Sequence, residues 1–172
     1  MDEDIGRYNP LSAISEYQRL SDPIAPEPHR HSKREYPMPQ PDYIDPNYPL
    51  SALTSKAIGA CKVVYRHLGP GFNEILYQRA LALELPAHGV DFSREVWIDV
   101  FYRGQKIGRK RVDFIVSDSS GSVMIEIKAK AALEDVDFVQ TLSYLKASGY
   151  KVGLLINFGG KQLEVKRLAN KA

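Results

Sequence analysis

Three segments rich in β-forming residues follow one another with only short turns between them. They read VWIDVFY at 96–102, IGRKRVDFIVS at 107–117 and VMIEIKAK at 123–130, and the turns are RGQK and DSSG. Strands joined by turns this short pair antiparallel with their neighbours. The sequence therefore predicts an antiparallel three-strand meander, which fixes the middle of the fold before any other element is placed.

Helical and strand patterns on both sides of the meander complete the architecture. Apolar residues at helical spacing predict helices over 51–68, from residue 72 or 73 to 85, and over about 133–147, each ended by glycine or proline. The continuous apolar run at 151–158 is typical of a strand covered on both faces, and 163–168 is a candidate edge strand. The predicted class is α/β, a mixed central sheet flanked by helices.

The first fifty residues differ in composition from the rest. Residues 1–50 hold 9 of the 11 prolines and 5 basic against 9 acidic residues, a net charge of −4, which leaves 18 against 12, a net of +6, for the remainder. Proline disfavours long helices and central strands. We predict a mostly disordered acidic arm over 1–50 and one domain over 51–172. The arm is either a plain linker or a segment that docks on the domain or on a protein partner.

Cysteine content and hydropathy exclude several classes of protein. Cys61 is the only cysteine, so an intramolecular disulfide, a thiolate-rich zinc site and a protein-ligated iron–sulfur cluster are excluded. No apolar run approaches the roughly 18 residues of a membrane span, and the N-terminus has no signal-peptide core. These features predict a soluble intracellular protein without a membrane partner, in cytoplasm or nucleus.

The strand at 123–130 carries charge in the middle of an apolar run. Alternate side chains of a strand lie on opposite faces, so Glu126 and Lys128 share one face. A solvated outer face is the ordinary interpretation. Closing the hairpin at DSSG gives a sharper one, because that register pairs apolar residues with one another and places Asp113 opposite Glu126. The apolar partners in this register are Val112 with Ile127, Phe114 with Ile125, and Val116 with Val123.

Two opposed carboxylates repel each other at the Cβ spacing of a ladder, about 4.5 to 5.5 Å. A divalent cation such as Mg²⁺ turns that repulsion into binding, because hard ions take carboxylate oxygens and also bind waters and substrate phosphates. An ion-pair lattice is the alternative, because four cations belong to the same face: Arg109, Arg111, Lys128 and Lys130. The residues alone leave both interpretations open.

Four short motifs occur in order between residues 52 and 160. They are G-x-x-E-x-x-Y within LGPGFNEILYQRALALEL, Asp113 in RVDFIV, Glu126 to Lys128 in EIK, and Q-x-x-x-Y within QTLSYLKASGYKVGLLINFGG. Together they closely resemble the GxxExxY protein family, a branch of the PD-(D/E)xK nuclease-like superfamily. Val112 stands where the superfamily name has proline, and Tyr65 stands where the family is expected to show histidine.

The resemblance implies a restriction-endonuclease-like core and a role for each matching residue. Asp113 and Glu126 are expected to bind the metal and Lys128 to be the catalytic lysine. Glu74 is expected to reach the same centre from its helix, although a carboxylate in a first helical turn also simply favours the helix dipole. Gln140 and Tyr144 match the Q-x-x-x-Y element of RecB-like nucleases, which supports the site or contacts nucleic acid. The predicted nucleic-acid contacts are Tyr77, Arg109, Arg111 and Lys130.

These residues predict a nuclease that uses Mg²⁺ or Mn²⁺ to hydrolyse phosphodiester bonds, with DNA as the expected substrate. One alternative is a catalytically silent module of the same fold that binds nucleic acid or a protein. Another is a toxin-like or defence-associated component that needs a partner through its acidic arm. DNA against RNA, ends against interiors of the strand, one metal against two, and the oligomeric state stay open at the level of sequence.

Overall fold

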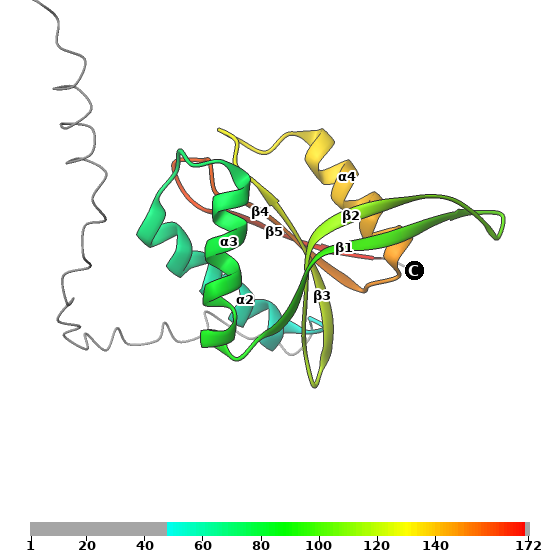
Figure 1. The fold of residues 1–172 in the computed structure, drawn as a ribbon, viewed down its shortest axis with the longest axis horizontal. Helices are drawn as coiled ribbons and strands as arrows, with labels where there is room; N and C mark the ends of the chain where they lie inside the picture. The colour runs from blue at the N-terminus through cyan, green and yellow to red at the C-terminus, as the bar shows by residue number, and fades with distance from the viewer. Residues whose placement is uncertain (1–47, 171–172) are drawn as a thin grey trace, which may run out of the picture. The chain divides into compact units, whose positions relative to one another are not determined.

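The computed structural model describes residues 48–170, which form one five-stranded sheet with helices on both faces (Figure 1). The arm predicted over 1–50 lies almost entirely outside these residues. In chain order the elements are α2 (Ser51–Leu68), α3 (Glu74–Glu84), the short 3₁₀ helix η1 (Pro86–His88), β1 (Asp91–Tyr102), β2 (Gln105–Asp118), β3 (Gly121–Lys128), α4 (Asp135–Ser148), β4 (Val152–Asn157) and β5 (Glu164–Ala169).

The sheet has the strand order β1-β2-β3-β4-β5. Strands β1, β2 and β3 pair antiparallel, so the predicted meander is confirmed. β3 and β4 are parallel and joined through α4, as a crossover connection requires. β1 begins at Asp91 rather than at residue 96, because its polar start pairs with the end of β2, where Phe92 lies opposite Val116. Tertiary pairing here overrides weak β propensity.

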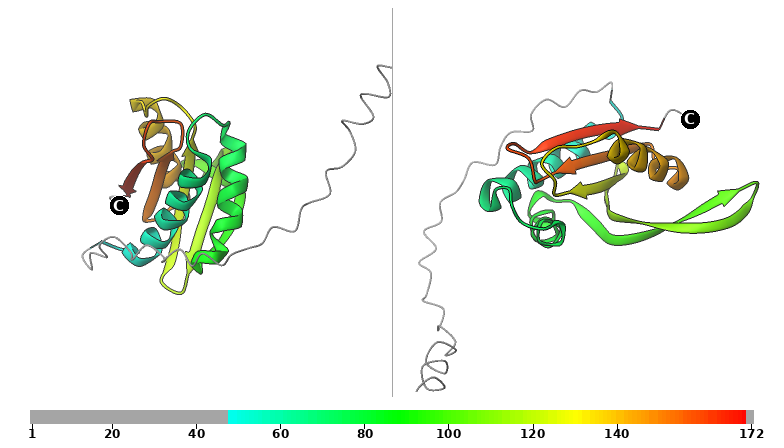
Figure 2. Two further views of the ribbon diagram at one scale, coloured as in Figure 1. Left: turned by 90° about the vertical axis from the view of Figure 1, so that its left-hand side faces the viewer. Right: turned by 90° about the horizontal axis from the view of Figure 1, so that it is seen from above.

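Helices α2 and α3 cover one face of the sheet, and α4 covers the other (Figure 2). The core under α2 and α3 is the larger and includes Tyr77, Phe114 and Phe158. On the other face, Met124 of β3 packs with Leu145 of α4. Successive residues of β3 therefore enter different cores, as the pleat demands. Among the helices of residues 48–170, none combines the length and apolarity needed to cross a membrane.

The register between β2 and β3 is the predicted one, from Asp118↔Gly121 to Phe114↔Ile125. The ladder stops there, so the predicted pairing of Val112 with Ile127 and the direct opposition of Asp113 and Glu126 do not occur. The physical reason lies at Asp113, whose Oδ2 accepts a hydrogen bond from the backbone N–H of Ile127 at 2.7 Å. A side chain thus takes the donor that a continued ladder would use, and β2 leaves β3 at this residue.

Beyond Asp113, β2 pairs with β1 alone, and the two strands project from the body as a long ribbon (Figures 1 and 2). We call residues 97–111 the hairpin arm. Its two-residue turn contains Arg103 and Gly104, both at positive φ (47° and 78°), as a tight hairpin with two left-handed turn positions requires. Glu95, at the base of the arm, also has positive φ (53°) and lies where the register passes Asp113.

Candidate active site

The candidate site lies where β2 separates from β3, between α3 on one face and α4 on the other. β2 supplies Asp113, and β3 supplies Glu126 and Lys128. The end of β3 is also the carboxyl end of the parallel pair β3–β4. Open α/β sheets bind ligands at the carboxyl ends of their parallel strands. The structure therefore brings the predicted catalytic triplet together at the end of the sheet where such folds bind ligands.

Asp113 is oriented by two donors from different elements. Gln78 Nε2 on α3 donates to Oδ1 at 2.9 Å, and the N–H of Ile127 donates to Oδ2 at 2.7 Å. Burial raises the pKa of Asp113, and the hydrogen bond from Ile127 and the charge of Lys128 offset part of that increase. The side chain is thus held in one direction, with its ionised form partly stabilised.

Among the candidate site residues, Glu126 has the least favourable surroundings for its ionised form. It is 6% exposed, and its Oε1 accepts from Lys128 Nζ at 3.1 Å, while its Oε2 is buried with no hydrogen-bond partner. Burial, followed by repulsion from Asp113, raises the pKa of Glu126 to about 7. An ionised carboxylate with an unsatisfied buried oxygen is costly. A cation near Oε2 would therefore stabilise the ionised form of Glu126.

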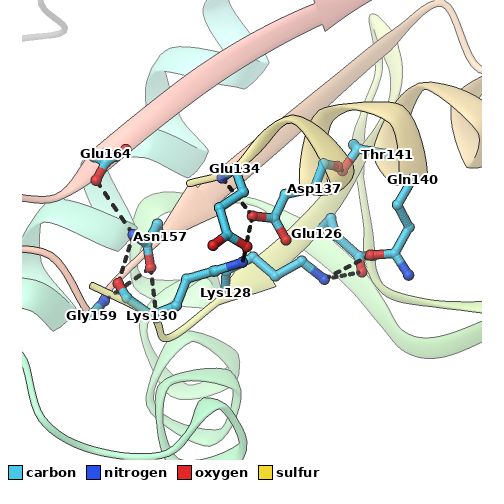
Figure 3. Close-up of polar contacts among 10 residues, drawn as sticks. All are labelled: Glu126, Lys128, Lys130, Glu134, Asp137, Gln140, Thr141, Asn157, Gly159 and Glu164. Atoms are coloured by element: carbon cyan, nitrogen blue, oxygen red, sulfur yellow. Dashed lines mark hydrogen bonds and ion pairs between the residues drawn. The ribbon is translucent and has the colours of Figure 1, made fainter. Parts of the chain in front are cut away.

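Lys128 is held between β3 and α4 (Figure 3). Its Nζ donates to Glu126 and, at 3.0 Å, to Oε1 of Gln140, whose own Nε2 donates to the Tyr144 hydroxyl at 2.8 Å. Although burial lowers the pKa of Lys128, the neighbouring carboxylates, Glu126 foremost, raise it overall. The four-residue spacing of Gln140 and Tyr144 places both on one face of α4, and the structure brings both into contact with the lysine network.

Glu74 stands at the first turn of α3, one residue after the N-cap Asn73. Gln78 Nε2 lies 3.5 Å from Glu74 Oε1 and also binds Asp113, so it links the two acids. Burial and then the charge of Asp113 raise the pKa of Glu74. Gln78 was missed by the sequence analysis. Its signal was the spacing of four from Glu74, which puts both side chains on the same side of the helix.

The G-x-x-E-x-x-Y motif has a direct structural explanation. Gly71 adopts φ of 112°, a conformation that disfavours other residues, in the loop before α3. The Tyr77 hydroxyl donates to the carbonyl of Gly69 at 2.7 Å and accepts from the N–H of Phe72 at 3.2 Å. Tyr77 is fully buried and stacks on Phe158 with ring centroids 4.7 Å apart. The predicted nucleic-acid contact at Tyr77 is therefore wrong, because its ring and hydroxyl are both inside the protein.

A match to a family model supports this geometry. The model of the PD-(D/E)XK nuclease superfamily matches residues 51–168, which is the whole sheet apart from its last residue and all described helices. The chain belongs to the PD-(D/E)XK nuclease superfamily. The structure also resembles the crystal structure of SSO0001, with a TM-score of 0.45 and 19% identity, over 58% of this chain and 51% of that one, so the chain spans about half of that protein. No curated protein matches the sequence.

In this PD-(D/E)XK domain the side chain of Lys130 binds Glu134 and Asp137 at the start of α4, not Asp113 or Glu126. Its Nζ binds Glu134 Oε2 at 2.6 Å and Asp137 Oδ2 at 2.9 Å (Figure 3). Glu134 and Asp137 also form the capping box that starts α4. These contacts let Lys130 fix the helix that carries Gln140, while its contact with nucleic acid stays a prediction, because the side chain is 32% exposed.

Asn157, at the end of β4, holds the loop that follows Lys128 and was not identified from sequence. Its side chain accepts from the N–H of Lys130 and of Gly159, and donates to the carbonyl of Lys130 (Figure 3). A Cβ on Gly159 would stand 2.4 Å from the Lys130 nitrogen, so only glycine fits there. The sequence signal was the polar residue that ends an apolar run in LLINFGG.

The two arginines predicted to contact nucleic acid, Arg109 and Arg111, lie on the hairpin arm. Arg109 lies over the ring of Trp97, with its guanidinium carbon 4.2 Å from the ring centroid. Arg111 pairs with Glu95 at 3.1 Å. Both are exposed, so both are accessible to a nucleic-acid ligand.

The donor set of this PD-(D/E)XK domain fits a hard divalent cation. Within residues 48–170 no group of three or more His, Cys, Asp or Glu side chains is placed to hold a metal. Mg²⁺ is commonly bound through one or two carboxylates, with waters and substrate phosphates completing its shell. Glu126, with its buried, unpartnered Oε2, and Asp113, whose charge raises the pKa of Glu126, are therefore the candidate ligands of such an ion.

Proposed function

We propose that the domain hydrolyses phosphodiester bonds of DNA with Mg²⁺ or Mn²⁺ as its cofactor. The observation that carries the proposal is the buried Oε2 of Glu126, which lacks a hydrogen-bond partner and lies in the field of Asp113. Glu126 and Asp113 would hold the ion, and Glu74 lies close enough to act on both electrostatically. Superfamily membership supports the same chemistry.

Each residue of the site has a part in that chemistry. A bound divalent ion would polarise the scissile phosphate and make water a better nucleophile. Lys128, whose pKa is raised, stays protonated near neutral pH. It is therefore suited to neutralise a phosphate oxygen as charge develops, and not to remove a proton. Gln140 fixes the direction of the ammonium, Tyr144 fixes Gln140, and Gln78 with the Ile127 N–H fixes Asp113.

Within the superfamily we assign the domain to the GxxExxY group with a Q-x-x-x-Y element. The support is that each motif residue has a defined contact. Gly71 and Tyr77 shape the loop before α3, Glu74 faces the acids through Gln78, and Gln140 with Tyr144 holds Lys128. A motif that matched by chance would not converge on one site from three separate elements.

Cleavage assays on the purified chain test the proposal. Single- and double-stranded DNA are incubated with Mg²⁺, with Mn²⁺ or with EDTA, and products are followed on gels. We expect cleavage with either metal, none with EDTA, and a rate lower by roughly 10²- to 10⁴-fold in Asp113→Asn and Lys128→Ala. Lys146→Ala, an exposed position on α4, is the matched control. Cleavage equal in all four proteins would indicate a contaminating nuclease and contradict the proposal.

A catalytically silent module is the second candidate, because Lys128 Nζ is already bound to Glu126 and Gln140 and residues 48–170 hold no three-ligand metal group. Under this function the chain binds nucleic acid without metal, with affinity that falls as salt rises. Asp113→Asn then leaves binding intact or strengthens it, because it removes a negative charge. Binding of this kind, together with no metal-dependent cleavage by the wild type, would favour the silent module.

A further inference from the structure

We propose that the hairpin arm, residues 97–111, enters the major groove of duplex DNA and guides the duplex to the site. The inference deepens the proposed function and rests on it for the identity of the substrate. The arm is outside the catalytic network, yet it is the direct continuation of the strand that carries Asp113.

The hairpin arm is strongly basic. The arm holds five basic residues and one acid, Asp99, a net of +4 over fifteen residues, and Asp99 is already paired with Lys106 at 2.7 Å. Arg109 and Lys110 are neighbours in an exposed strand, so their side chains lie on opposite faces of the ribbon. Cations on both faces suit an element that lies between two phosphate backbones, as a groove provides.

The hairpin arm also exposes apolar surface. The base of the arm packs on α4 through Ile98, which is buried in the cluster that contains Leu145. Four of its large apolar side chains are nevertheless exposed: Trp97 (52%), Phe101 (60%), Tyr102 (61%) and Ile107 (66%). A two-stranded ribbon of this kind is marginal in water. In a major groove such apolar side chains can contact thymine methyl groups, while the interleaved cations contact phosphates.

The dimensions and stiffness of the hairpin arm support the same inference. Ten residues separate Asp113 from the turn at Arg103, roughly 33 Å of strand. One turn of B-form DNA is about 34 Å. The tight turn at Arg103 and Gly104 closes the ribbon without a flexible loop. A duplex held along the arm would therefore have its backbone led to the carboxylates within about one helical turn.

The groove geometry selects DNA among duplexes. The major groove of B-form DNA, about 12 Å wide, admits a two-stranded ribbon, whereas that of A-form RNA is deep and narrow. Single strands have no groove for the two faces of the ribbon to fill. The structure therefore fits a DNA duplex better than either alternative.

Binding of the full chain to DNA in EDTA tests the inference without any need for cleavage. Fluorescence anisotropy of a labelled 30-base-pair duplex is measured against salt for the wild type, for Arg103→Ala/Lys110→Ala and for Lys151→Ala/Lys166→Ala. The last pair removes the same charge from exposed positions near the opposite edge of the sheet. Trp97 is the only tryptophan, so its emission reports on the arm directly.

We expect the arm variant to lose roughly tenfold to sixtyfold in affinity at 0.1 M salt and about 2 from the slope of log K against log salt. The control pair should lose little, and the duplex should change Trp97 emission. Equal losses in both variants, unchanged Trp97 emission, equal affinity for double-stranded RNA, tighter binding of single strands, or no binding by the wild type would each overturn the inference. Arm-dependent binding without cleavage overturns the proposed activity alone, and cleavage without arm dependence overturns this inference alone.

Discussion

The two halves of strand β2 differ in burial and in the number of strands with which they pair. From Phe114 to Val116 every side chain is buried, and each residue pairs with β1 on one side and β3 on the other. From Gln105 to Arg111 every residue is exposed and pairs with β1 alone. Asp113 lies at the boundary, where its carboxylate takes the N–H that would have continued the sheet. The candidate site exists because β2 leaves the core of the sheet at this residue.

Deleting a large apolar side chain from each half gives the largest expected contrast. Phe114→Ala removes a fully buried ring that packs in the core under α2 and α3, and should lower the free energy of unfolding by about 3–5 kcal/mol. Ile107→Ala, on the arm, should change it by no more than about 0.5 kcal/mol. Urea denaturation of both variants measures the difference. Similar losses would mean that Ile107, near the tip of the arm, also packs on the body in solution.

Glu126, beside this boundary, should make the free energy of unfolding depend on pH. Folding raises the pKa of Glu126 from 4.5 to about 7, so the folded state binds its proton more tightly than the unfolded chain does. The stability that this proton confers is complete below about pH 4.5 and is lost as the pH rises through about 7. The total is roughly 3 kcal/mol. Urea denaturation from pH 5 to 8 should show the decline.

Glu126→Gln should reduce that decline, and not abolish it, because burial also raises the pKa of Asp113 and Glu74. Asp99→Asn, which removes a carboxylate from the arm instead, is the matched control. Mg²⁺ at pH 8 should stabilise the wild type and not Glu126→Gln, because the ion binds the ionised carboxylate. A slope unchanged by Glu126→Gln would contradict the assignment of the buried acid.

Much of the fold and part of the site follow from the sequence because they depend on local rules. The meander follows from turn length, the register from the apolar pattern, and the helix ends from glycine and the capping residues. Gln140 and Tyr144 follow from helical periodicity once the motif is seen. Superfamily membership, which the resemblance predicted, is confirmed.

The remaining features depend on contacts between segments far apart in the chain, which no local pattern encodes. Asn157 holds the loop at Lys130, 27 residues away, and Gln78 reaches Asp113 across 35. The end of the ladder at Phe114 depends on a side chain outcompeting a backbone carbonyl for one N–H. Tyr77 illustrates the same limit, because its motif position was visible but its burial under Phe158 was not.

The smallest predicted contrast compares one hydroxyl group in the body with one on the arm. Tyr77→Phe leaves the Gly69 carbonyl and the Phe72 N–H without their partner in a loop that positions Glu74, and should lower the free energy of unfolding by about 1–3 kcal/mol. Tyr102→Phe removes a hydroxyl from an exposed arm residue and should cost close to nothing. If both variants unfold at the wild-type urea concentration, water replaces the Tyr77 hydroxyl at no cost. The loop before α3 would then be set by Gly71 and the Asn73 cap alone.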